Sequence, residues 1–152
     1  AVTLAVWLRG KCKTRDVAPY LFAQVLGAAL ASELVGLLKQ GTPVHALTLQ
    51  VVPALLAELF LTFALAFVVL HVATSKKSAG NSYFGLAIGF TVMAAAYAAG
   101  GISGGAFNPA VAVGLTLMGL STAGNLWIFL VANFAGGALA ALVFRLTNPD
   151  ES

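Results

Sequence analysis

Long apolar stretches and short polar connections alternate along this chain of 152 residues. Each of the four longest apolar stretches is close to the ~20 residues that a helix needs to cross the ~30 Å hydrocarbon core of a bilayer. They predict spanning helices at 17–38, 52–73, 83–100 and 124–146. The alternative is a soluble all-helical core, which the absence of a polar face on these helices disfavours. The pattern therefore predicts one all-α membrane domain over residues 1–152.

A shorter apolar segment lies between the third and fourth stretches. The glycine-rich residues 100–107 lead into Asn108-Pro109-Ala110, where Asn is a strong N-cap and proline is favoured at the first helical position. A helix from here to about residue 119 is ~16 Å long, about half of the hydrocarbon core. Non-helical backbone at that depth survives only where it lines a cavity. Residues 101–120 therefore predict a re-entrant loop and half-helix beside a pore or transport site.

Composition and charge placement add an orientation. The chain is 60% hydrophobic and 9% charged with a mean hydropathy of +0.95, whereas soluble domains carry ~25% charged residues. Seven of the eight basic residues fall on one side of the predicted helices: Arg9, Lys11, Lys13, Arg15, Lys76, Lys77 and Arg145. The positive-inside rule makes that side cytoplasmic, and Lys39 alone falls on the other. We expect a multi-pass protein of a plasma or inner membrane with cytoplasmic basic loops. Because no basic stripe is interleaved with aromatic residues, no nucleic-acid partner is expected.

The start of the chain resembles the predicted half-helix. Residues 1–6 and 110–115 share the same register of small apolar side chains, and each leads through a polar turn into a full span. The first copy enters from the cytoplasmic side and the second from the outside, as an inverted repeat requires. On this interpretation Ala1 is the third residue of an earlier Asn-Pro-Ala box, and residues 1–12 end a first re-entrant half-helix.

In this order, the motifs resemble those of the aquaporin (major intrinsic protein) family over nearly the whole chain. Residues 1–5 are similar to the end of the family's first Asn-Pro-Ala box and residues 103–110, Ser-Gly-Gly-Ala-Phe-Asn-Pro-Ala, to its second. The third to sixth helices of the family resemble residues 19–28, 57–63, 85–89 and 127–143. The resemblance implies a right-handed helical bundle with an inverted repeat, here truncated to four of six spanning helices. It also implies a longer parent protein that forms a homotetramer.

The resemblance implies a passive channel for water and small uncharged solutes in a lipid bilayer, with no catalytic residues, metal or cofactor. Two half-helices would aim their positive ends, each about +0.5 charge, at one point and repel cations. Asn108 would offer N–H donors to water, and the backbone carbonyls before it would form a ladder of acceptors. The implied pore and selectivity residues are Ala1, Ala96, Gly104, Gly105, Ala106, Phe107, Asn108, Pro109, Ala110 and Val111.

Two polar residues within the spans are candidates for structural support. Glu58 is the one acid deep in a predicted span, where a charge costs at least ~2.5–3.5 kcal/mol and is usually partnered. The resemblance favours a carboxylate that accepts N–H bonds from the glycine-rich loop, and the alternative is a proton relay. Gln24 is expected to hydrogen-bond between helices. His71 and His45 fit no site by their spacing, and a part in gating stays open.

The filter positions depart from the patterns of water-selective and glycerol-conducting relatives. They fall at Ala96, Gly105 and Val111, the last where most relatives have arginine. Glycerol-conducting relatives usually have Asp at the position of Ala112. A small apolar filter would admit water, glycerol, ammonia, urea or peroxide, so solute preference stays open. Also open are a non-conducting structural protein whose pore is occluded by Tyr97, and a chain that is inert because its pore lacks a wall.

Overall fold

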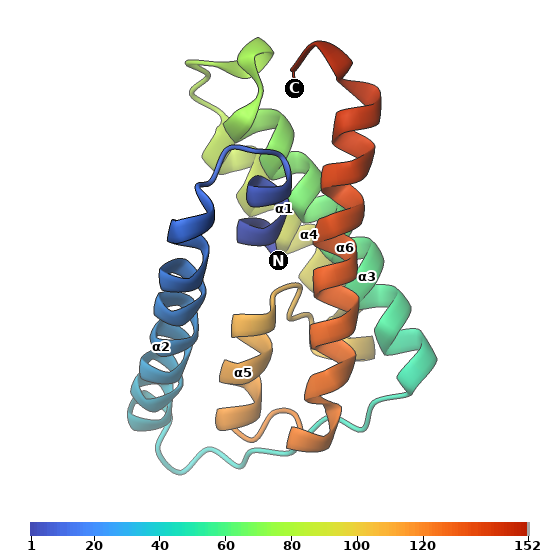
Figure 1. Ribbon diagram of the computed structural model, residues 1–152. Coiled ribbons are helices and arrows are strands. Elements are labelled where there is room, and N and C mark those ends of the chain that lie inside the picture. Colours follow the sequence, from blue (N-terminus) through green and yellow to red (C-terminus); the bar gives the residue numbers. More distant parts are fainter. Residues whose placement is uncertain (152) are drawn as a thin grey trace.

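The computed structural model describes residues 1–151 as an all-helical bundle (Figure 1). In chain order the α-helices are α1 (Val2–Leu8), α2 (Thr14–Leu38), α3 (Val51–Val69), α4 (Phe84–Ser103), α5 (Pro109–Leu117) and α6 (Leu126–Thr147). A π-helical turn, Leu70–Thr74, extends α3, and 3-10 turns occur at Lys76–Ser78, Ala123–Asn125 and Pro149–Glu151. Four helices, α2, α3, α4 and α6, are long and apolar enough to cross a membrane. The predicted all-α fold class is confirmed.

Some helix ends differ from the expected boundaries. Helix α4 continues through Ser103, so residues 101–103 belong to this helix and not to the re-entrant loop. Gly100 and Gly101 do not break the helix. It ends because Gly104 adopts the left-handed region with a φ of 89°. Helix α2 begins at Thr14, three residues before the expected start. Helix α5 ends at Leu117, since Gly119 has a φ of 74°.

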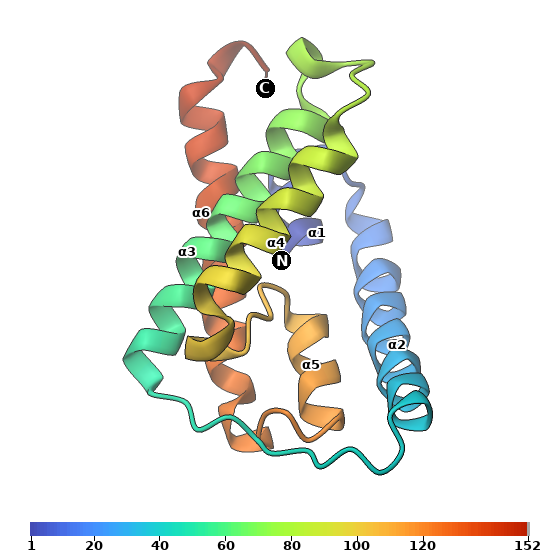
Figure 2. The same cartoon turned by 180° about the vertical axis from the view of Figure 1, so that it is seen from behind.

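The two short helices α1 and α5 lie nearly end to end between α2 on one side and α3, α4 and α6 on the other (Figures 1 and 2). Their N-terminal ends face each other at mid-height of the bundle. Helix α1 packs mainly against α6, and α5 packs mainly against α2. Each short helix thus contacts the long helix that follows the other short helix, which is the arrangement that an inverted repeat produces.

Two neighbouring glycines set the closest helix approaches. A Cβ on Gly136 of α6 would lie 2.6 Å from the carbonyl oxygen of Leu59 in α3, and one on Gly137 would lie 2.7 Å from that of Ala1. Both distances are shorter than any ordinary contact, so the absence of a side chain lets these backbones meet. Helix α6 is therefore held against α3 and against the start of α1 at the same level.

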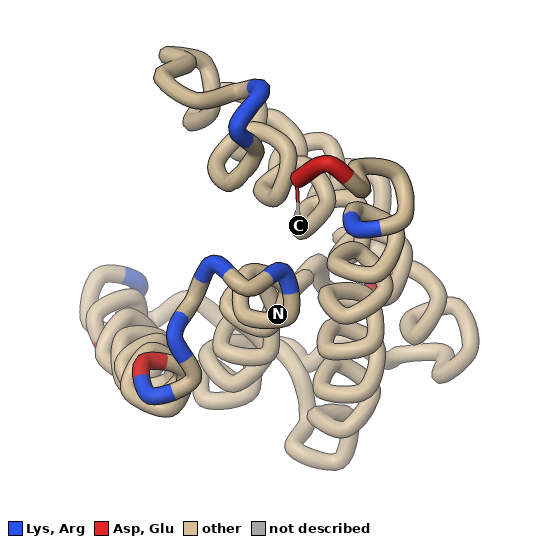
Figure 3. The backbone as a smooth tube through the Cα atoms, turned by 45° about the horizontal axis from the view of Figure 1, so that its top comes forward, with Lys and Arg blue, Asp and Glu red and all other residues tan. Residues whose placement is uncertain are grey.

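Charged residues gather at one end of the bundle (Figure 3). This end, called the basic end below, is where α1, α3 and α6 finish and α2 and α4 begin. It carries Arg9, Lys11, Lys13, Arg15, Lys76, Lys77 and Arg145. Lys39 follows α2 at the opposite end. The fold thus brings to one end the seven basic residues that the sequence assigns to one side.

The sides of the bundle are apolar. Helix α2 buries only Ser32, while Phe22 is 71% and Leu30 63% exposed. Helix α4 likewise exposes Phe90 and Met93. So many exposed large apolar side chains are rare on soluble monomers and suit contact with lipid or with further helices.

Candidate pore site

Residues 104–108 form the loop that joins α4 to α5 in the middle of the bundle (Figure 1). Gly104 and Gly105 have left-handed φ values of 89° and 69°, which glycine adopts without steric cost. Phe107 also has a positive φ of 48°, a conformation that costs roughly 1–2 kcal/mol for a residue with a Cβ. Its ring is 1% exposed and packs against α3 and α4. Burial of the ring therefore holds the backbone in this turn.

Glu58 of α3 is fully buried and binds the loop directly. Its Oε1 accepts hydrogen bonds from Ser103 Oγ (2.6 Å) and from the backbone N–H of Ala106 (2.9 Å). Its Oε2 accepts from the backbone N–H of Phe107 (2.7 Å). Hydrogen bonds to an ionised acceptor are roughly twice as strong as neutral ones, so one carboxylate fixes two successive amides of the loop. The sequence singled out Glu58 but not its partner Ser103.

Asn133 of α6 links this carboxylate to the start of α5. With its amide nitrogen turned toward Glu58, Asn133 donates to Glu58 Oε2 (2.9 Å) and to Thr62 Oγ1 (3.0 Å). Its oxygen then accepts from the backbone N–H of Asn108 (2.9 Å). The reverse orientation would set the amide oxygen against a carboxylate, so the neighbours fix the assignment. Sequence reasoning missed Asn133, and the available signal was a lone amide in an otherwise apolar span.

Asn108 caps the half-helix α5. Its Oδ1 accepts from the backbone N–H of Ala110 (3.1 Å), and Pro109 fills the first helical position, where no donor is needed. The amide nitrogen of Asn108 donates to no residue within 1–151. The side chain is half-buried, so this nitrogen is a donor left over at the positive end of the helix.

Both half-helix starts reach one cavity of about 230 Å³. Its lining includes Ala1, Gln24, Asn108, Pro109 and Ala110. Gln24 of α2 donates from Nε2 to Thr3 Oγ1 of α1 (2.7 Å), so it bridges two helices beside this cavity. The structure thus brings Ala1 and Asn108, which are far apart in the sequence, to the same place.

The three predicted filter positions lie on α4, on the loop and on α5. A Cβ on Gly105 would lie 3.7 Å from the Cα of Ala96, so these two residues are neighbours. Val111 lies on the first turn of α5 and is 44% exposed. Tyr97, next to Ala96 in α4, is 88% exposed. Within residues 1–151, no group of three or more His, Cys, Asp or Glu side chains could hold a metal ion.

Comparison with known proteins identifies the family. The family model described as Major intrinsic protein matches residues 1–144. The chain belongs to the major intrinsic protein family. Members of this family are channels and not enzymes, and the four apolar helices agree with an integral membrane protein.

Curated aquaporins match over nearly the whole chain. The chain is 36% identical to maize (Zea mays) Aquaporin NIP1-1 over 155 residues, which cover 97% of the chain and 54% of that relative. It is also 36% identical to maize Aquaporin TIP2-1 over 148 residues, which cover 95% of the chain and 59% of that relative. Aquaporin AqpM of Methanothermobacter marburgensis is 34% identical, with 95% of the chain and 64% of the relative covered. The chain therefore spans between 54% and 64% of the length of these relatives.

Proposed function

We propose that the full-length protein is a passive transmembrane channel for water and small uncharged solutes that excludes ions. The observation that carries this proposal is the meeting of two half-helix starts, at Ala1 and Asn108, beside one cavity inside an apolar bundle. Each helix N-terminus acts as about half a positive charge, and in surroundings of low dielectric such charges repel a cation strongly. The matches to aquaporins support the same function.

The groups proposed to contact the solute are polar but uncharged. The free amide nitrogen of Asn108 supplies a donor, and the backbone carbonyls of residues 104–107 supply acceptors. A neutral solute that exchanges hydrogen bonds along such a path binds weakly enough to leave again. Glu58 and Asn133 support this function indirectly, because they fix the loop and the first residue of α5.

Solute selectivity is proposed to be loose. Ala96, Gly105 and Val111 are small and apolar, so they add neither a fixed charge nor donors to the constriction. This supports a facilitator of glycerol, ammonia or urea as the second candidate function.

We further propose that the basic end faces the cytoplasm of a plasma or inner membrane, because loops rich in Lys and Arg are retained on that side. A homotetramer is proposed as the assembly. Exposed apolar side chains of α2 and α4, such as Phe22 and Phe90, support contacts with lipid and neighbouring subunits.

A single substitution that blocks the pore tests the proposed function. Liposomes that contain the full-length protein should shrink faster than empty liposomes in stopped-flow light scattering after an osmotic step. Val111→Trp should abolish the gain, because a large ring fills the constriction. Leu142→Trp is the matched control, since Leu142 is 55% exposed on α6 and away from the loop. Wild-type permeability equal to that of empty liposomes, or equal losses in both variants, would contradict the proposal.

A further inference from the structure

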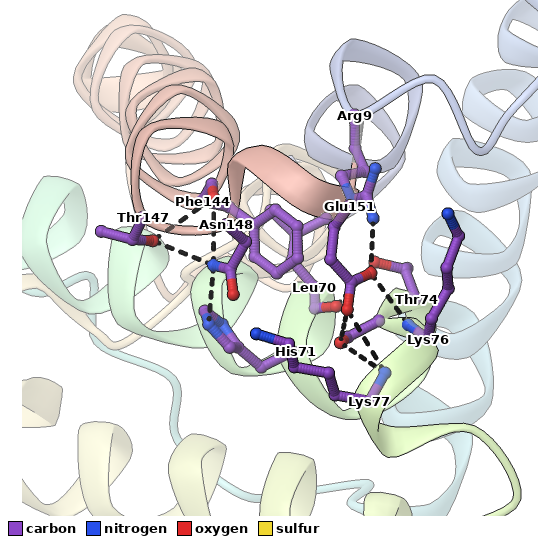
Figure 4. A network of polar contacts seen from close by, with 11 residues as sticks. Arg9, Leu70, His71, Thr74, Lys76, Lys77, Phe144, Thr147, Asn148 and Glu151 are labelled. Carbon is purple, nitrogen blue, oxygen red and sulfur yellow. Dashed lines mark hydrogen bonds and ion pairs between the residues drawn. The ribbon is translucent and has the colours of Figure 1, made fainter.

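A buried ion pair at the basic end takes no part in the proposed pore. Arg9 follows α1, and Glu151 lies in the last described turn, 142 residues later in the chain (Figure 4). Arg9 Nη2 and Glu151 Oε2 are 3.1 Å apart, and the two side chains are only 1% and 2% exposed. The Arg9 guanidinium also lies 4.6 Å from the centre of the Phe144 ring, in a cation–π contact.

The Glu151 carboxylate also binds the loop between α3 and α4. Its Oε1 accepts from the Ser75 hydroxyl and from the backbone N–H of Lys77 (3.3 Å). Its Oε2 accepts from the backbone N–H of Lys76 (2.8 Å). One guanidinium, one hydroxyl and two backbone amides therefore converge on one anion, and they compensate the cost of burying its charge.

The turn that carries Glu151 is anchored to the end of α6. Asn148 Nδ2 donates to the carbonyl oxygen of Phe144 (3.1 Å) and lies 3.4 Å from Nε2 of His71. His71 Nδ1 lies 2.9 Å from the carbonyl oxygen of Phe67, which fixes the ring. These contacts hold the Glu151 side chain beside the loop, so its carboxylate has a high effective concentration there.

The donor set would remain without Glu151. Arg9 is 5% exposed, and its Nε has no hydrogen-bond partner among the described residues. Ser75 is also buried, at 7% exposed. Removing the carboxylate therefore leaves a buried guanidinium and several donors aimed at a space of carboxylate size. Such a group either binds a replacement anion or remains a buried, unpaired charge, which is strongly unfavourable.

We propose that Glu151 is an intramolecular ligand of an anion-binding site formed by Arg9, Ser75 and the backbone amides of Lys76 and Lys77, and that its occupancy holds the loop of residues 75–81 in place. The site recognises a carboxylate by charge-assisted hydrogen bonds. It lies away from the proposed pore, so the proposal does not depend on conduction.

Trypsin tests the proposal, because Lys76 and Lys77 are exposed and lie in the loop. In the full-length protein in lipid nanodiscs, Glu151→Ala should raise the rate of cleavage after these lysines several-fold. Asp150→Ala is the matched control, since it removes the same charge from an exposed neighbour. Added formate should slow cleavage of the Glu151→Ala protein toward the wild-type rate, and chloride at the same ionic strength should not.

Each outcome supports or overturns the proposed site. Equal cleavage rates in wild type and Glu151→Ala would overturn the proposal, and so would fast cleavage that formate does not slow. If Glu151→Ala fails to fold, as judged by gel filtration and helix content, Glu151→Gln replaces it. This variant keeps the shape but loses the charge, so it should be cleaved faster than wild type and be insensitive to formate. If Glu151→Gln is cleaved by trypsin as slowly as wild type, the proposal is overturned.

Discussion

At the scale of single residues, one buried carboxylate organises the loop that precedes α5. Glu58 accepts two loop amides, and Asn133 extends the same network to the backbone of Asn108. Phe107 keeps its left-handed conformation within this network because the surrounding contacts over-determine it. The position of the proposed pore groups therefore depends on residues that do not themselves contact solute.

Two substitutions of Glu58 separate shape from hydrogen bonding. Glu58→Gln retains the shape and one good acceptor, so we expect it to fold and conduct with reduced stability. Glu58→Ala strands the buried amides of Ala106 and Phe107 at about 1–3 kcal/mol each, so we expect misassembly. Thermal unfolding followed by gel filtration, together with water permeability, measures both effects. Equal behaviour of the two variants would show that Glu58 does not support the loop.

Val111 is proposed to set the size and polarity of the constriction. Val111→Arg would add a fixed positive charge and five donors and would narrow the path. We expect glycerol flux to fall far more than water flux, whereas Val111→Leu, which adds bulk without charge, should change the ratio little. Paired swelling assays with water and glycerol measure this ratio. An unchanged ratio in Val111→Arg would mean that Val111 does not line the filter.

At the scale of elements, the bundle depends on close crossings of backbone. Helix α6 meets α3 and the start of α1 at two adjacent glycines, Gly136 and Gly137. The half-helices are held in line because each packs against the long helix of the other half. A small change at one crossing should therefore move the half-helix starts relative to each other.

A pair of glycine substitutions tests this crossing. Gly136→Ala places a Cβ 2.6 Å from the Leu59 carbonyl oxygen, so we expect a loss of about 1–3 kcal/mol through overpacking. Gly89→Ala is the control, because nothing lies within 4 Å of a Cβ there and alanine favours a helix interior by about 1 kcal/mol. Melting temperatures of the two variants in the same detergent give the comparison. Similar melting temperatures would contradict a close α3–α6 crossing.

The elements were more predictable than their contacts. Span length and hydropathy marked the four long helices, and Asn108-Pro109 marked the start of α5. The continuation of α4 to Ser103 was missed because two glycines in a row, Gly100 and Gly101, resemble a loop, although both lie within the helix. Ser103 and Asn133 were missed for a related reason. A single hydroxyl or amide in an apolar segment gains its role only when a distant residue, here Glu58, arrives beside it.

At the scale of the whole molecule, Glu151 links the turn after α6 to Arg9, which follows α1, and to the loop after α3. The pKa of Glu151 is lowered to about 2. The largest cause is the hydrogen bond from Ser75, and the amides of Lys76 and Lys77 and the charge of Arg9 add to it. The stability that the ionised Glu151 adds to the fold is therefore fully present above the ordinary glutamate pKa of about 4.3. It is lost as the pH falls toward about 2.

Hydrogen exchange reports this dependence on pH. We expect protection of the Lys76 and Lys77 amides, corrected for intrinsic exchange, to stay constant from about pH 8 to about pH 5 and to fall below about pH 4. Glu151→Gln should show low protection throughout. A loss of protection between about pH 8 and about pH 5 would mean that another group controls the loop.

The most direct test of a channel that passes water and excludes ions measures both fluxes in the same liposomes. For the full-length wild-type protein, we expect osmotic water permeability well above that of empty liposomes and proton and sodium fluxes equal to theirs. Asn108→Asp should retain water flux and the helix cap but admit cations, because a negative charge offsets the positive helix end. The account would be contradicted if liposomes with the wild-type protein showed no gain in water permeability, or showed ion fluxes above those of empty liposomes.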